Sequence, residues 1–383
     1  MKRSVTDMVD IPHVPESVTV EWLTDILRRS DTIDSGTRAV GISWQKIAAG
    51  FTSYVVRFAV QYSSEVDAPD SFVGKFPIAI DEIPARLAHL VTKEVGFYQE
   101  IEDAGVAIPR CYFAASDDEN HVFVLLEDLG SEDWSDQLIS ATPEQSEVVM
   151  KALAKLHAKW WNHADLADFS WLNQPAPVDQ AEMVTLFQES ITEFNTAFGD
   201  ACPQLSQIGD MFLRFLQTNP SQLRSTNATG NRTLIHGDVR LGNIKFVGDE
   251  VVFFDWQLVG SSGAVVDLTY WLGCNYSVED RRANEQSILR IYSDELKRHG
   301  VDYPVKKLKS DIRFQLLGRC LSRLSTFSLT SETLFATDDG RQFLEYDLQG
   351  LEGMLVDYKV LRYFRMLGFV MSIYGRIRRL FRL

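Results

Sequence analysis

The chain has 383 residues, of which 45% are hydrophobic and 24% charged, so its composition is that of a globular protein and excludes a disordered chain. Its length allows two or three ordinary domains or one large two-lobed enzyme. The formal net charge of -15 excludes a global basic surface for nucleic acid, so no nucleic-acid partner is expected. The acidity is compatible with a cationic substrate, but we favour ordinary solubility in the cytosol as its explanation.

The four cysteines are far apart and form no CxxC pair, which argues against a zinc site built on cysteine and favours free thiols in a reducing compartment. They are Cys111, Cys202, Cys274 and Cys320. Residues 1–17 contain no apolar run of the signal-peptide type, and no stretch approaches the ~18 apolar residues of a membrane span. A cytoplasmic location is therefore expected.

The first part of the chain is predicted to be a small β-sheet with one main helix inserted. Apolar residues at helical spacing predict a helix over 19–29, and a second helix is expected over 84–103 with proline in its first turn. Runs rich in β-branched and aromatic residues predict strands. These runs cover 40–60, with a turn at 48–50, and then 71–76, 111–115 and 121–129.

After residue 130 the pattern turns helical. Helices are predicted over 144–161, 180–198 and 205–217 and over most of 278–383, while 219–231 is a polar loop. Between them, a hairpin is expected to pair 244–247 with 251–254 across a three-residue turn, 248–250. The boundary between a β-rich part, residues 1–130, and a helix-rich part, residues 131–383, is placed near Gly130.

The strongest chemical signal is the run LIHGDVRLGNIKF followed by VVFFDWQ. Asp238 and Asn243 lie five residues apart, and the predicted hairpin returns the chain to Asp255, so the three side chains can surround one small volume. Mg²⁺ prefers carboxylate and amide oxygens, which suits Asn243 and Asp255 as ligands, while Asp238 suits deprotonation of an acceptor hydroxyl. Phosphoryl transfer needs such groups. The alternative is a polar hairpin with solvated carboxylates.

The pattern HGD, Asn and a downstream Asp-Trp-Gln resembles the kinase-like small-molecule phosphotransferases of the aminoglycoside phosphotransferase and choline kinase group. With GSSGAVVDLTYWLG over 260–273, it is most similar to the ecdysteroid-kinase-like family. The resemblance covers roughly residues 40–300. It implies an α+β, bilobal, protein-kinase-like fold, with a nucleotide-binding N-terminal lobe and a helical C-terminal lobe. It also implies ATP and Mg²⁺ as cofactors.

The resemblance also implies which residues bind the nucleotide. Lys75 resembles the lysine that contacts the phosphates, with Glu94 as its partner on the next helix and Glu100 as the alternative. Gly50 and Ser53 lie in a turn that resembles the phosphate-covering loop, although most such turns have no such role.

Further residues are implied as the hinge and as supports. The backbone of 127–129, including Glu127 and Leu129, would hydrogen-bond adenine, while the acidic side chains there could simply face solvent. Asp267 would brace the catalytic loop through backbone hydrogen bonds. His236 is expected to organise that loop without an evident partner, and His157 to be a core histidine.

Residues 170–230 are expected to form the substrate-binding insert, whose phenylalanines either line a pocket or, as we favour, form helix core. They are Phe187, Phe194, Phe198, Phe212 and Phe215. Trp256 and Tyr270 are close enough to the motif to touch substrate. HGD in place of HRD, and the absence of an APE segment, disfavour a peptide substrate.

The end of the chain, from Lys359 to Arg382, combines basic and apolar residues without an acidic one. This pattern is typical either of an amphipathic helix in weak contact with an anionic membrane surface or of a helix packed on the C-terminal lobe. The oligomeric state is not predicted by the sequence.

Taken together, the residues predict ATP-dependent transfer of a phosphoryl group to a hydroxyl of a small molecule. A nucleotide-binding scaffold without turnover is the alternative, although every catalytic position is filled. The acceptor stays open among aminoglycosides, amino alcohols, sugars, steroids and hydroxylated xenobiotics.

Overall fold

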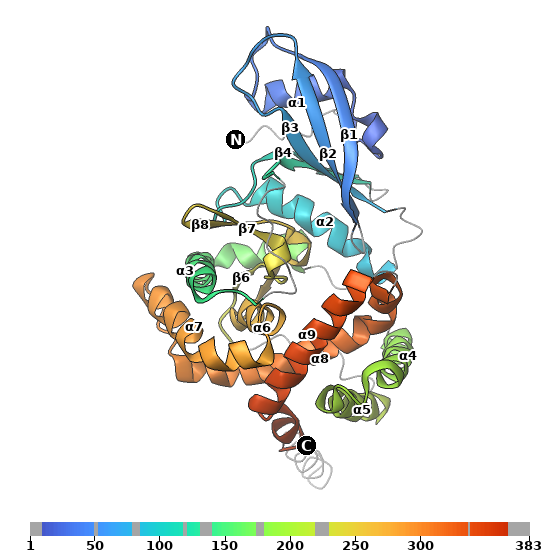
Figure 1. The fold of residues 1–383 in the computed structure, drawn as a ribbon, viewed down its shortest axis with the longest axis vertical. Helices are drawn as coiled ribbons and strands as arrows, with labels where there is room; N and C mark the ends of the chain where they lie inside the picture. Colours follow the sequence, from blue (N-terminus) through green and yellow to red (C-terminus); the bar gives the residue numbers. More distant parts are fainter. Residues whose placement is uncertain are drawn as a thin grey trace.

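The computed structural model describes residues 10–49, 53–78, 85–117, 121–130, 140–173, 180–218, 230–335 and 338–366. Figure 1 shows a β-sheet at the N-terminal end of the molecule and a larger helical part that carries the C-terminus. The fold is α+β, as predicted. None of the described helices is long and apolar enough to cross a membrane.

The N-terminal part is an antiparallel five-stranded sheet with the order β1-β2-β3-β5-β4. Its strands are β1 (Ala39–Ala49), β2 (Ser53–Tyr62), β3 (Ser71–Pro77), β4 (Cys111–Ser116) and β5 (Val122–Glu127). Every neighbouring pair is antiparallel, so short hairpins suffice except between β3 and β4, where a helix is inserted. The strands predicted from β-rich runs are all present.

Two helices flank this sheet. Helix α1 (Val20–Arg29) is capped by Thr19, whose hydroxyl accepts from the Trp22 amide at 3.1 Å, and it packs its apolar side on phenylalanines of the sheet. Helix α2 (Ala85–Glu100) buries Val95 against β5 and lies between the sheet and the helical part (Figure 1). The position of α2 brings its polar residue Glu94 to the junction of the two parts.

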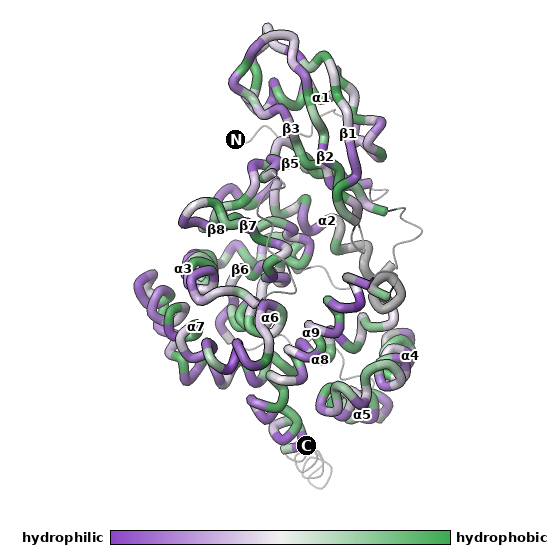
Figure 2. Tube along the Cα trace, viewed as in Figure 1, coloured by the Kyte–Doolittle hydropathy of each residue, from purple (hydrophilic) through white to green (hydrophobic). Residues whose placement is uncertain are grey.

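The C-terminal part has one large apolar core formed by its helices. They are α3 (Pro143–Lys159), α4 (Gln180–Phe198), α5 (Pro203–Thr218), α6 (Val265–Cys274), α7 (Val278–Arg298), α8 (Val305–Phe335) and α9 (Asp338–Asp357). Helix α3 begins with a capping box between Thr142 and Gln145. Figure 2 shows α6 as mostly apolar, as expected for a central helix, whereas α7 is polar along much of its length.

Two short β-pairs accompany the helices of the C-terminal part. Strand β6 (Thr233–Ile235) pairs with β9 (Gly260–Ser262), and β7 (Ile244–Val247) pairs with β8 (Glu250–Phe253). The hairpin was predicted one residue out of place, since Val247 pairs with Glu250 around a two-residue turn at Gly248. The segments between these strands carry the HGD, Asn and Asp-Trp-Gln residues.

Candidate functional site

The HGD turn is held in one conformation by its glycine. Gly237 has a φ of +87°, and a Cβ at this position would overlap the carbonyl oxygen of Leu258. Only glycine tolerates both the left-handed backbone and this close approach. The turn therefore fixes where the next residue, Asp238, leaves the backbone.

Asp238 and Asn243 lie side by side. The Asn243 Nδ2 donates to Asp238 Oδ2 at 2.8 Å and to the Asp238 carbonyl oxygen at 3.0 Å. Because the amide nitrogen is engaged in this way, the Asn243 Oδ1 is the atom left to bind a cation. The predicted proximity of these two residues is present.

Asp255 is brought to the same place by the β7–β8 hairpin. The amide of Phe254 donates to the Asn243 carbonyl oxygen at 3.1 Å, so the residue before Asp255 is bonded to Asn243. Asp255 has a left-handed backbone with φ of +62°, which is uncommon for a residue other than glycine. Its Oδ2 also accepts from Gln257 Nε2 at 3.4 Å.

Lys75 connects the sheet to this group. Its Nζ donates to Glu94 Oε2 at 2.5 Å and to Asp255 Oδ1 at 2.6 Å. Glu94 is therefore the partner of Lys75, as predicted, whereas the alternative, Glu100, is exposed at the end of α2. Glu94 Oε1 also accepts from the Trp256 amide at 3.3 Å, which fastens α2 to the segment that follows Asp255.

The charges of these buried groups support one another. Burial by itself would lower the pKa of Lys75, but Asp255 and Glu94 outweigh burial and raise the pKa above its ordinary value. Burial would likewise raise the pKa of Asp255, yet Lys75 and then Arg240 hold it below the usual range. For Glu94 burial prevails and its pKa is raised. The site therefore keeps an ammonium beside an ionised Asp255.

The buried carboxylate of Asp267 is hydrogen-bonded to the backbone of the HGD turn. Asp267 accepts from the His236 amide at 2.9 Å and from the Gly237 amide at 2.8 Å, which confirms the predicted bracing. His157 Nε2 lies 3.1 Å from Asp267 Oδ2, and its Nδ1 lies 2.8 Å from the Tyr292 hydroxyl. His157 is thus a hydrogen-bonded core histidine, as predicted.

His236 has partners that the sequence did not indicate. Its Nε2 donates to the Phe254 carbonyl oxygen at 2.9 Å, since a carbonyl can only accept, and its Nδ1 accepts from the Asp238 amide at 3.3 Å. The ring therefore joins the HGD turn to the residue before Asp255, which explains how it organises the loop.

Two further polar residues belong to the site, although the motif did not single them out. Arg240 lies with its Nε 3.4 Å from Asp238 Oδ2, and its guanidinium stands over the Phe343 ring. The buried Asn275 accepts from the Leu241 amide at 2.7 Å and holds the loop between the HGD turn and Asn243. Arg240 stands inside the variable part of HGD-x4-N, and Asn275 directly follows α6, so only their tertiary contacts identify them.

The other residues predicted to bind the nucleotide are Ser53, Gly50 and the hinge residues Glu127 and Leu129, and the structure places them differently. Ser53 is buried at the start of β2 and lines a small hollow together with Lys75 and Glu94. Gly50 lies outside the described residues, as does most of the turn around it. Of the residues predicted as the hinge, Glu127 ends β5, where it pairs with Phe72 at the start of β3, and Leu129 lies two residues beyond the strand.

The acidic hinge side chains do not simply face solvent. Asp128 forms a two-bond ion pair with Arg57 of β2, at 2.6 and 3.1 Å, and Glu127 Oε2 accepts from the Arg110 amide at 3.0 Å. The Leu129 carbonyl oxygen accepts from the Lys245 ammonium. These contacts fix the hinge backbone between the two parts of the molecule.

One candidate substrate contact was wrong. Trp256 is fully buried and stacks on Phe97, with ring centroids 4.0 Å apart, so it belongs to the core and cannot reach a substrate.

The favoured interpretation of the phenylalanines is confirmed, because Phe187 and Phe194 are buried in the main core. Tyr270 is partly buried beneath the Arg319 guanidinium. Of the basic C-terminal segment, the described part ends at residue 366, so the rest of that prediction lies outside the described residues.

The sequence profile of the ecdysteroid kinase-like family matches residues 48–302, about two thirds of the chain and close to the span predicted from the motifs. The chain belongs to the ecdysteroid kinase-like family. A kinase-like protein of Caenorhabditis elegans, described as uncharacterized, is 26% identical over 270 residues, which are 66% of this chain and 69% of that protein.

Solved structures similar to this family member show the fold. A putative aminoglycoside phosphotransferase from Ralstonia eutropha has a TM-score of 0.51 at 14% identity, covering 90% of this chain and 98% of that one. The spectinomycin phosphotransferase APH(9)-Ia, in complex with ADP and spectinomycin, has a TM-score of 0.51 at 10% identity, with 90% and 99% coverage. A Plasmodium vivax ethanolamine kinase has a TM-score of 0.50 at 12% identity, with 89% of each chain covered.

Proposed function

We propose that this chain is an ATP-dependent O-phosphotransferase that phosphorylates a hydroxyl of a small molecule. The observation that carries the proposal is the ammonium of Lys75, which contacts Glu94 of α2 and Asp255 beside the catalytic turn at the same time. Membership of a kinase-like family supports it, as does the shared fold with a spectinomycin phosphotransferase and an ethanolamine kinase.

Each side chain then has a distinct task. Asp238 accepts the proton of the acceptor hydroxyl while the hydroxyl oxygen bonds to the γ-phosphorus and the bond from phosphorus to the β–γ bridging oxygen breaks. Lys75 binds the phosphates of ATP. The backbone near Glu127 and Leu129 receives adenine, and Gly50 and Ser53 cover the phosphates.

The donor set suits Mg²⁺. Asn243 offers its Oδ1, since its nitrogen is bonded to Asp238, and Asp255 offers an ionised carboxylate, so the available ligands are oxygens. When bound, the ion would neutralise negative charge on the phosphates.

Three further proposals concern the rest of the chain. Helices α4 and α5, within residues 170–230, are the proposed substrate-binding region, and residue 130 is the proposed boundary between the two lobes. The cytoplasmic location stays a prediction.

The test is a screen for ATP-dependent gain of one phosphate among small molecules, read by mass spectrometry. Neutral, cationic and hydroxylated lipophilic alcohols should be offered in parallel. The parent is expected to modify at least one class, and Asp238→Asn to lower that rate by about 10²–10⁴-fold. Equal rates in the two proteins would refute the role of Asp238. Nucleotide binding with no product from any class would favour the scaffold instead.

A further inference from the structure

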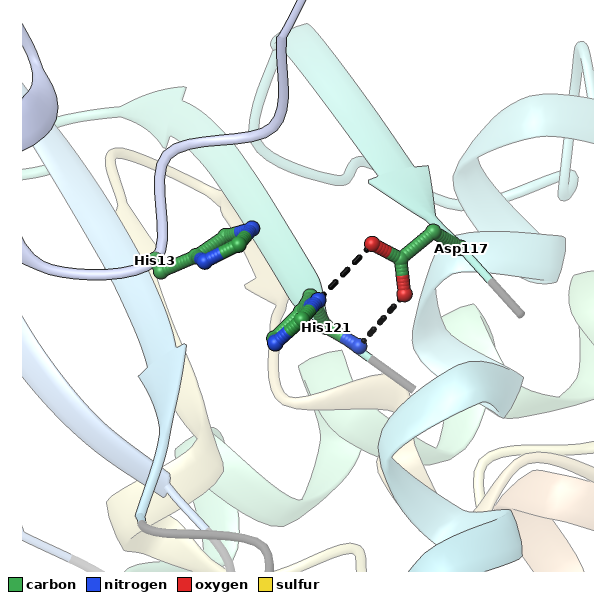
Figure 3. Close-up of side chains that lie close together, drawn as sticks. All are labelled: His13, Asp117 and His121. Atoms are coloured by element: carbon green, nitrogen blue, oxygen red, sulfur yellow. Dashed lines mark hydrogen bonds and ion pairs between the residues drawn. The ribbon is translucent and has the colours of Figure 1, made fainter. Parts of the chain in front are cut away.

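A second polar cluster lies where β4 turns into β5, and it shares no residue with the site described above. Figure 3 shows His13, Asp117 and His121 gathered at one point, with the two imidazole rings parallel and the carboxylate beside His121. One ligand atom from each of the three residues lies within 4.8 Å of the others. Among the described residues, no other group of three His, Cys, Asp or Glu side chains brings its ligand atoms as close together.

The β4–β5 hairpin builds two of the three positions. Asp117 follows β4 and His121 precedes β5, and the Asp117 amide donates to the His121 carbonyl oxygen at 3.1 Å. The Asp117 carboxylate accepts from the His121 amide at 2.9 Å and lies 2.8 Å from the His121 Nδ1. The backbone and the side chains therefore hold this pair in register.

The third position comes from the segment before α1. The Asp10 carbonyl oxygen accepts from the Trp22 indole at 2.8 Å, and Ile11 packs on the apolar core of the sheet, so the backbone on the N-terminal side of His13 is tethered. Pro15 is buried on the other side. The His13 ring then stacks on His121 with centroids 3.7 Å apart and planes 16° apart.

We propose that His13, Asp117 and His121 form a binding site for a first-row transition-metal dication such as Zn²⁺. The two imidazole nitrogens suit zinc or nickel, and zinc also accepts a carboxylate oxygen, whereas magnesium prefers an all-oxygen set of ligands. Three protein ligands leave the fourth tetrahedral position to water. All three side chains are at least partly exposed, so an ion can enter from solvent.

Binding requires a small rearrangement. Metal–ligand bonds of about 2.0–2.2 Å place neighbouring ligand atoms of a tetrahedral ion about 3.3 Å apart. The three ligand atoms lie within 4.8 Å of one another, so the distances between them must shorten when an ion binds. The lone pairs of stacked rings point in parallel directions and cannot converge on one ion. The imidazoles must therefore tilt out of their stack, which exposed side chains can do at little cost.

The consequence concerns the N-terminal segment. An ion shared by His13 and the β4–β5 hairpin would fasten residues 10–14 to the nucleotide-side sheet. Because such an ion binds the folded chain and not the unfolded one, it should raise the melting temperature, and more so the more tightly it binds. This inference does not depend on the proposed phosphotransferase activity.

The test uses the full chain, freed of any affinity tag and treated with chelator. Zn²⁺ is titrated by calorimetry and Co²⁺ by visible absorption, both in excess Mg²⁺ so that oxygen-only sites are filled. We expect one ion for each chain. His13→Ala and His121→Ala should weaken its binding by more than about 10–100-fold and abolish the rise in melting temperature, since even outer partners of a metal contribute that much.

His163→Ala is the matched control. His163 is also exposed and lies 3.5 Å from a carboxylate, that of Asp165, but among the described residues it belongs to no three-ligand group. Its removal should leave metal binding unchanged. Metal binding equal in the parent and His13→Ala, or lost equally in His163→Ala, would overturn the proposal. Melting curves without metal show whether each variant is folded.

Discussion

Gly237 and Asp255 both adopt left-handed backbone conformations, one on each side of the site. At Gly237 the conformation is free of strain because the residue has no Cβ, whereas Asp255 bears it while bonded to Lys75. At such positions the backbone turns in directions that regular strands and helices do not offer. The geometry of the site is therefore set by individual residues as much as by the elements around them.

Gly237→Ala should displace the HGD turn, because the added methyl group meets the Leu258 carbonyl oxygen and the backbone is left-handed. We expect a loss of at least about 1–3 kcal/mol in unfolding free energy. Phosphoryl transfer should fall by about 10²-fold, since Asp238 would move. Gly248→Ala is the control, because its φ is also positive but its surroundings are empty, so it should cost about 1 kcal/mol and leave turnover intact. Equal turnover of both variants would contradict the account.

Glu94→Gln should weaken the ion pair that positions the Lys75 ammonium. A charge-assisted hydrogen bond contributes about 1.5–3 kcal/mol, so kcat/KM for ATP should fall by about 10–100-fold. Glu100→Gln, on the same helix but exposed, should change kcat/KM by less than about twofold. Steady-state kinetics at varied ATP decide between the two, and a larger effect at Glu100 would show that the partner is misassigned.

At this scale the sequence predicts the residues that a motif spacing fixes, such as Asp238, Asn243 and Asp255. It does not predict Asn275 or Lys245, whose tasks arise when distant segments meet. It also misplaced Trp256, because closeness in sequence to Asp255 said nothing about which way the ring points. That ring turns inward to stack on Phe97.

The helices beneath the site are joined by a buried charge cluster at the crossing of α8 and α9. Asp347 is almost fully buried, accepts from Arg319 Nη2 at 2.6 Å, and is also paired with Arg323. Arg319 further donates to the Thr269 carbonyl oxygen of α6. Three helices are thus held by one carboxylate and two guanidinium groups. Hydrophobic periodicity predicted these helices but could not predict this cluster, because its members are far apart in sequence.

Asp347→Asn should change how stability depends on pH. Burial would raise the pKa of Asp347, but Arg323 and Arg319 outweigh it and hold the pKa far below the ordinary value. A carboxyl with a lowered folded-state pKa contributes stability above its unfolded pKa of about 3.9, and the contribution is lost as the pH falls toward the folded value. The variant should be less stable than the parent by about 3–5 kcal/mol at pH 7, and the gap should narrow below about pH 4.

Urea unfolding across this pH range measures the gap. Glu345→Gln is the control on the same helix, since the ion pair between Glu345 and Arg341 is exposed. It should leave unfolding free energy within about 0.5 kcal/mol of the parent at every pH. A gap for Asp347→Asn that is constant with pH would contradict the linkage.

For the whole molecule, the decisive contacts are those that cross between the sheet and the helical part. Lys75 reaches Asp255, Lys245 reaches the Leu129 carbonyl oxygen, and Glu94 accepts from the Trp256 amide. The change from β-rich runs to helical periodicity along the chain predicted a β-rich part followed by a helical part. It could not predict these crossing bonds, because composition carries no information about which surfaces meet.

Binding of Mn²⁺ in the presence of ADP, followed by electron paramagnetic resonance, tests the central claim without knowledge of the acceptor. Asn243→Ala and Asp255→Asn should weaken Mn²⁺ binding by at least about tenfold, since each removes or neutralises a ligand. Asp238→Asn should bind the ion within about twofold of the parent, because its task is proton transfer. Mn²⁺ affinity unchanged by Asn243→Ala and Asp255→Asn would contradict the account.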